Sequence, residues 1–184
     1  MSRIDQLLTS FRRHVGLPLR PGLPLSQRVW FVVYPPEEER RLGPRLPEFE
    51  LATKDAGLNW ERIDVSGSFA EWLDSRDDKN EIVGDPELVE SYADPDYAEW
   101  LKGKVAESLA EIPDEQADKT VLALTGLMEL YDFIHVSDLI DTLDKKFPGV
   151  LLVLFPGERD ANTYRFLEAR DGWDYLAVPI LPES

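Results

Sequence analysis

Continuous apolar stretches alternate along the chain with stretches in which apolar residues recur every third or fourth position. The continuous stretches are rich in β-branched and aromatic residues, which is typical of strands buried on both faces. They predict strands at residues 28–34, 120–124, 150–155 and 175–180, and residues 60–65 are a shorter and weaker candidate for a fifth strand. The helical spacing predicts helices within 37–57, at 69–73, from 94 to just before 113, and at 137–146.

Capping residues and helix breakers mark where these elements begin and end. Gly57 is a typical helix stop, and Pro47 suits the first turn of a second helix within 37–57. Asp85-Pro86 and Asp94-Pro95 each place a capping carboxylate before a proline, and Ser137 is a good N-cap. We predict a polar loop at 74–85 and a turn at 156–157. Two segments stay open between helix and extended chain, 127–134 and 162–170.

The N-terminus has a pattern of its own. Residues 2–15 carry apolar side chains at helical spacing, and the proline- and glycine-rich residues 16–26 predict an extended connector. In the remainder, strands alternate with helices, which requires crossover connections and a parallel sheet. We therefore predict a single α/β domain over 1–184, with a mainly parallel sheet of about five strands flanked by helices. Residues 1–26 form its N-terminal helical arm and connector.

Composition and charge narrow the classes of function. The 184 residues suit one domain, since domains usually hold about 100–200 residues. The net charge is −16, with five basic residues and one acidic residue in 1–28, so the basic charge is concentrated at the N-terminus. Duplex DNA repels an acidic protein overall, which disfavours direct nucleic-acid binding. The absence of cysteine excludes disulfides and thiolate chemistry. Without an apolar run of the ~20 residues that span a bilayer, we expect a cytoplasmic protein with no membrane partner.

Motifs that would carry catalysis are missing from the sequence. There is no glycine-rich dinucleotide loop, and the only Gly-Lys pair, Gly103-Lys104, lies inside a predicted helix. His14 and His135 lie in different elements. We expect no enzyme activity and no cofactor. Two alternatives stay open. The first is a degenerate nucleotide- or nucleic-acid-binding protein, in which the loops at 125–126 and 156–157 would hold a phosphate and the basic N-terminal arm would contact DNA. The second is a divalent-metal hydrolase that uses Glu158, Asp160 and Asp171.

The segment 154–179 carries the most specific pattern. It combines a strand end, an Asn-Thr-Tyr-Arg run and an Arg-Asp-Gly-Trp-Asp-Tyr turn. Tryptophan, tyrosine and arginine are the preferred anchors of protein interfaces. We therefore predict a partner-binding patch made of Glu158, Tyr164, Arg165, Arg170, Asp171 and Trp173. A structural turn, with Trp173 and Tyr175 packed on the core, is the alternative interpretation.

The same segment resembles a known family. The pattern FPGExxxNTYRxLxARDGWxYLAVPI, from Phe155 to Ile180, is similar to the C-terminal signature of the BrxB family of BREX (bacteriophage exclusion) systems. Similar stretches occur at 28–34, 48–53, 69–73 and 123–130, whereas Pro44, Pro47 and residues 159–161 depart from the family pattern. The resemblance implies an accessory subunit that acts with other BREX proteins, chiefly the phosphatase-like PglZ. It carries over no catalytic residue and leaves a homo-oligomer open.

Overall fold

A parallel sheet forms the centre of the protein. The computed structural model describes residues 2–20, 22–131, 133–144, 146–161, 163–166, 173–174 and 177–182. The sheet consists of β1 (Val29–Tyr34), β2 (Asn59–Asp64), β3 (Thr120–Thr125), β4 (Val150–Asp160) and β7 (Val178–Ile180). Its order is β2-β3-β4-β1-β7, and each neighbouring pair is parallel. The predicted α/β class and mainly parallel sheet are confirmed.

The inner strands β1 and β3 carry a stronger apolar sequence pattern than the edge strand β2. Every residue of β1 and β3 is buried, as is usual for inner strands covered on both faces. By contrast β2 lies at an edge, and only Ile63 is buried in it. The last strand, predicted at 175–180, is confirmed over 178–180, and residues 175 and 176 lie outside the described residues.

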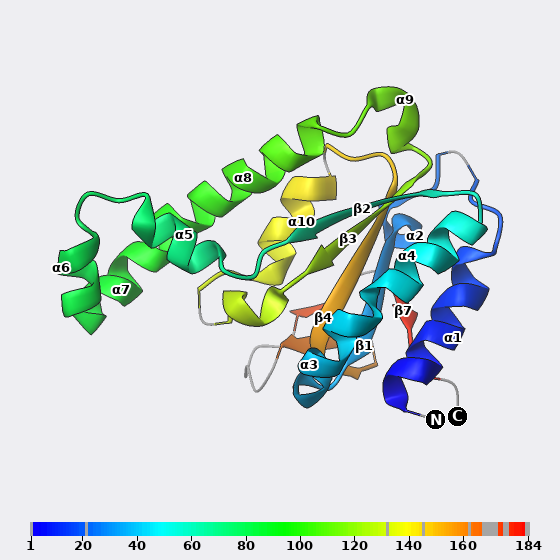
Figure 1. The fold of residues 1–184 in the computed structure, drawn as a ribbon, viewed down its shortest axis with the longest axis horizontal. Coiled ribbons are helices and arrows are strands. Elements are labelled where there is room, and N and C mark those ends of the chain that lie inside the picture. The colour runs from blue at the N-terminus through cyan, green and yellow to red at the C-terminus, as the bar shows by residue number, and fades with distance from the viewer. Residues whose placement is uncertain are drawn as a thin grey trace.

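One face of the sheet is covered by α1 (Arg3–Val15) and α4 (Leu46–Asp55), which pack against each other (Figure 1). The Phe11 ring joins both layers, with its centroid 5.0 Å from that of Phe49 and 6.5 Å from that of Trp30. A capping box starts α1, because Ser2 and Asp5 each accept a hydrogen bond from the other's backbone N–H. The predicted N-terminal helix is confirmed, and its apolar face belongs to the core.

Short helices flank β1. Before it lies α2 (Leu25–Arg28), and after it follow η1 (Pro36–Glu38), α3 (Glu39–Leu42) and η2 (Gly43–Arg45). The Arg28 guanidinium donates to the carbonyls of Leu23 at 3.1 Å, Phe147 at 2.8 Å and Gly149 at 3.0 Å. This side chain therefore ties the N-terminal connector to the segment that leads into β4.

The opposite face is covered by α8 (Ala98–Ala110) and α10 (Val136–Asp144), with α5 (Ser68–Asp74) and the 3-10 turn η4 (Leu127–Leu130) beside them (Figure 1). The Phe69 ring stacks on Phe133 with centroids 4.7 Å apart and meets Tyr97 edge-on at 5.3 Å. The predicted N-cap Ser137 is wrong. The helix begins one residue earlier, so Ser137 lies in its first turn.

From α5 to the start of α8 the chain forms an acidic arm, residues 68–99, whose tip lies beyond the sheet (Figure 1). It contains α6 (Lys79–Gly84), α7 (Pro86–Tyr92) and the π-helical turn η3 (Ala93–Tyr97), and α9 (Asp114–Ala117) follows α8. The Arg76 guanidinium holds the arm together, 5.1 Å from the ring centroids of both Trp72 and Tyr92. It also donates to Asp78 at 2.8 and 2.9 Å.

Two predictions for this arm are wrong. Residues 74–85 are not all loop, because α6 forms around the single buried residue Ile82. Asp94-Pro95 does not start a helix but lies inside the π-helical turn, which accommodates a proline that cannot donate a backbone hydrogen bond. The cap at Asp85 is confirmed by its 3.0 Å bond from the Glu87 N–H.

Within the described residues, no helix is long and apolar enough to cross a membrane.

Candidate functional site

The segment that carries the family-like pattern begins inside a strand. The turn predicted at Pro156 and Gly157 is wrong, because β4 continues through both residues to Asp160. The chain then returns as β5 (Thr163–Phe166), antiparallel to β4 and paired on its other side with β6 (Trp173–Asp174). Of the two possibilities for 162–170, the extended one holds over β5.

Gly157 explains why a strand fits here. A Cβ at this position would lie 2.1 Å from the Arg165 carbonyl oxygen and 2.7 Å from the Phe155 ring. Only a residue without a side chain allows β5 to approach β4 this closely. The glycine of the Phe-Pro-Gly-Glu run is therefore needed for the packing of the hairpin and not for a turn.

Tyr164 anchors the hairpin to the sheet. Its side chain is 2% exposed, and its ring meets Phe31 edge-on at 4.4 Å and Phe155 at 6.0 Å. Burial raises the pKa of the Tyr164 hydroxyl, and the Arg159 guanidinium, 5.9 Å from the ring centroid, opposes this shift. We predicted Tyr164 as a surface anchor, but its position makes it a core residue.

The other members of the predicted patch are placed unequally. Glu158 and Arg165 are exposed and lie opposite each other in the β4–β5 register. Trp173 pairs with Tyr164 through the backbone. Arg170 and Asp171 lie outside the described residues, as does the Trp173 side chain. The structure thus brings together one acidic and one basic side chain of the patch.

Carboxylates occupy the carboxyl ends of β2 and β3, where a parallel sheet usually binds ligands. Asp64 accepts from the Ser66 N–H at 3.0 Å and the Ser66 hydroxyl at 2.7 Å. Glu129 accepts from the backbone N–H groups of Gly67 and, at 3.1 Å, Phe69. These N–H groups are the donors that a phosphate would need. Carboxylates therefore already occupy the backbone donors that lie beside Gly126, which disfavours a phosphate there.

The metal alternative used Glu158, Asp160 and Asp171. Glu158 and Asp160 lie two residues apart in β4, and Asp171 is outside the described residues. Among the described residues, no three Asp, Glu or His side chains are grouped as a metal site requires.

His14 packs edge-on against Trp30, with centroids 4.4 Å apart, and burial lowers its pKa.

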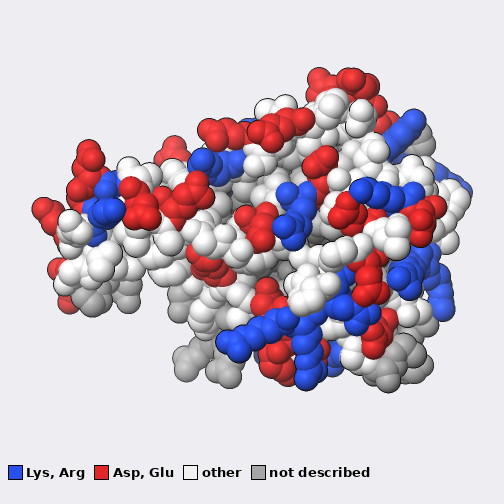
Figure 2. Space-filling view, viewed as in Figure 1, with Lys and Arg blue, Asp and Glu red and all other residues white. Residues whose placement is uncertain are grey.

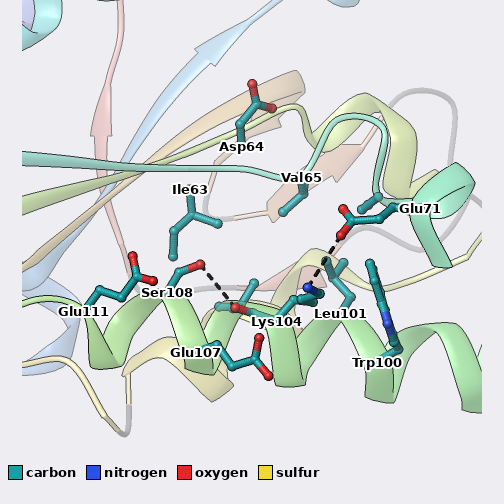
Figure 3. Close-up of a pocket in the computed structure, with 12 residues that line it drawn as sticks. Ile63, Asp64, Val65, Glu71, Trp100, Leu101, Lys104, Glu107, Ser108 and Glu111 are labelled. Carbon is teal, nitrogen blue, oxygen red and sulfur yellow. Dashed lines mark hydrogen bonds and ion pairs between the residues drawn. The ribbon is translucent and has the colours of Figure 1, made fainter. Parts of the chain in front are cut away.

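A groove of about 310 Å³ runs between the edge strand β2 and the helix α8, and α5 closes one end (Figure 3). Ile63 and Val65 form its floor on the side of β2. Lys104 lies 3.5 Å from the Glu71 carboxylate. We did not predict this groove, because the sequence reveals the apolar face of α8 but not how far the helix lies from the strand. The repeat of Glu107 and Glu111 on one helix side was the available signal.

Charge is distributed unevenly over the surface. The acidic arm has eleven acidic and two basic residues, which gives a net charge of −9 out of −16 for the whole chain. Figure 2 shows carboxylates dominating this arm, whereas lysines and arginines gather over the region of α1, α3 and α4. The molecule therefore presents an acidic end and a more basic end.

Comparison with protein-family models, with curated proteins and with solved structures finds no match to this chain.

Proposed function

We propose that the protein is a non-catalytic accessory subunit of a BREX anti-phage defence complex, which acts by binding partner proteins and chiefly the phosphatase-like PglZ. The observation that carries this proposal is the pattern from Phe155 to Ile180, which resembles the BrxB signature over 26 positions. A resemblance of this length, which includes Gly, Asn, Arg, Asp and Trp residues, is more specific than a short motif.

The geometry of the hairpin supports a binding role for part of this pattern. Gly157 and Tyr164 serve packing, since one allows close strand approach and the other fills the core. Glu158 and Arg165 have no such packing role, because both side chains are exposed. Exposed charged side chains on paired strands are suited to contact a partner.

A phage-plating assay tests the role in defence. The gene is deleted from its BREX operon and supplied again as the wild type or as Arg165→Glu. We expect the deletion to lose protection, the wild type to restore it, and Arg165→Glu to restore it incompletely. The matched control is a double variant, Glu158→Arg together with Arg165→Glu, which keeps an opposite-charge pair across the two strands. Full protection after deletion of the gene would overturn the proposal.

The nucleotide-binding alternative makes a different prediction. A nucleotide at 100 times its dissociation constant stabilises a protein by about 2.7 kcal/mol. We expect no rise in melting temperature with ATP, GTP or their diphosphates, because carboxylates already hold the backbone N–H groups of Ser66, Gly67 and Phe69 after β2. A rise with any of these nucleotides would restore the alternative.

A further inference from the structure

The edge strand β2 leaves peptide groups directed away from the sheet. The Asn59 N–H donates to the Lys119 carbonyl at 2.9 Å, and the Val65 N–H donates to the Thr125 carbonyl at 3.0 Å. Alternate residues of a strand bond toward the same neighbour, so the peptide groups of residues 60, 62 and 64 face outward. In the described part of the chain, β2 pairs with β3 alone. Such an edge is a template for a further strand.

The groove lies where an added strand would place half of its side chains. Figure 3 shows Glu71, Trp100, Ser108 and Glu111 pointing into the space between β2 and α8, whereas Asp64 points to the other side of the sheet. Successive side chains of a strand point to opposite faces. A strand beside β2 would therefore direct every second side chain into the groove.

The charges along the groove indicate the chemistry of its occupant. Four acidic residues line it, of which Asp64 points its carboxylate away from α8, and Lys104 is the only ammonium among the described lining residues. Lys104 is paired with Glu71 at 3.5 Å, which leaves Glu107 and Glu111 to attract basic side chains. The acidic arm adjoins the same end of the molecule and adds its net charge of −9. The Trp100 ring already holds the Lys104 ammonium 5.6 Å from its centroid, so the groove contains an aromatic side chain suited to a basic one.

We propose that the β2 edge and the groove bind an extended, basic segment of a partner protein, which joins the sheet as a strand beside β2. The backbone of the segment bonds to the outward peptide groups of residues 60, 62 and 64. Its alternate lysine or arginine side chains enter the groove toward Glu107 and Glu111. This inference rests on the proposed role as a partner-binding subunit and names one surface for it.

Fluorescence anisotropy with a labelled peptide of alternating lysine and valine tests the chemistry. We expect saturable binding that weakens as salt rises, because exposed charges are screened within about 10 Å at 0.1 M salt. The same peptide with glutamate in place of lysine should not bind. A lysine–valine peptide methylated on alternate amide nitrogens should bind weakly, since it cannot complete the ladder. Equal binding of the methylated and unmethylated peptides, or no binding at all, would overturn the proposal.

Two variants of the protein test the geometry. Arg62→Pro removes an outward N–H, and proline is tolerated at such edge positions. We expect it to weaken peptide binding by roughly fivefold or more, the effect of one lost hydrogen bond plus a misfit of the added strand, whereas Arg62→Ala keeps the N–H and binds normally. Glu107→Lys with Glu111→Lys should abolish binding, while Asp55→Lys with Asp141→Lys makes the same charge change at exposed sites outside the groove and retains it.

The same variants separate this inference from the proposed function. The readout is co-elution with PglZ in size-exclusion chromatography. If the wild-type protein co-elutes with PglZ and the Arg62→Pro variant does not, both proposals are supported. If Arg62→Pro and the Glu107→Lys, Glu111→Lys variant elute with PglZ as the wild type does, the groove is refuted as the docking surface while the accessory role stands. If wild-type protein does not bind PglZ but binds the lysine–valine peptide, the named partner is wrong and the groove stands. A homodimer that Arg62→Pro dissociates would assign the edge to a second copy and overturn the inference.

Discussion

Replacing Gly157 by alanine tests whether the family-like pattern is shaped by strand packing. The added Cβ would lie 2.1 Å from the Arg165 carbonyl oxygen, 3.1 Å from its carbon and 2.7 Å from the Phe155 ring. Two of these three atoms belong to the backbone, so a side-chain rotation cannot relieve the contact. Strand β5 has to move away from β4 by roughly 1–2 Å, since non-bonded heavy atoms prefer separations of about 3.5–4.0 Å.

We expect this overpacking to cost about 1–3 kcal/mol of unfolding free energy. In a domain of this size each kcal/mol lowers the melting temperature by about 2–4 °C. Gly157 faces Phe166 at the open end of the hairpin, and the five-stranded sheet does not depend on that pair. The loss should therefore be local. Hydrogen exchange should speed up in β5, and Tyr164 should become accessible, while amides of β1 and β3 stay protected.

Calorimetry and hydrogen exchange measure the two effects together. The matched control is Gly103→Ala, in the interior of α8, where an added Cβ meets nothing within 4 Å. This control should stabilise the protein by about 0.5–1 kcal/mol, because alanine favours a helix over glycine. A Gly157→Ala variant that melts with the wild type and keeps its β5 amides protected would refute the reasoning.

Three further predictions concern the core. Arg28→Lys should lower the unfolding free energy by about 1.5–3 kcal/mol, because lysine cannot reach all three carbonyls to which the guanidinium donates. Urea titration measures this loss, and an unchanged midpoint would contradict the prediction. Ser68→Ala should cost about 1–3 kcal/mol by leaving the Tyr97 hydroxyl unpaired, and adding Tyr97→Phe should recover part of that loss in a double-mutant cycle. His14 is stabilised in its neutral form, so its contribution is complete above pH 6.5 and is lost as pH falls through the lowered pKa of the folded state. His14→Phe should therefore lose less stability than the wild type between pH 7 and pH 5 in urea titrations, and equal losses would exclude this role.

The fold was predictable where burial alone determines the pattern. The inner strands β1 and β3 have continuous apolar sequences because both of their faces are covered, and α1 repeats its apolar residues because one side meets the sheet. The edge strand β2 gave a weaker signal, since only one of its side chains is buried. Helix α6 gave none, because a six-residue helix with one buried side chain has a polar sequence like that of a loop.

The candidate site was predictable only in part. Pro156-Gly157 has the composition of a turn, and only the approach of Arg165 from a later strand shows why glycine is needed there. Tyr164 has the composition of an interface anchor, yet it fills the space over Phe31. The groove between β2 and α8 arises from the spacing of two elements that are distant in the chain. No local pattern encodes that spacing.

We propose that this protein works by binding a defence partner. The most direct test is size-exclusion chromatography with light scattering on the protein co-expressed with a PglZ protein, the proposed partner. If the protein binds this partner, the two should co-elute at a defined stoichiometry, at both low and moderate salt. Separate elution of the two proteins at micromolar concentration in both salts would contradict it.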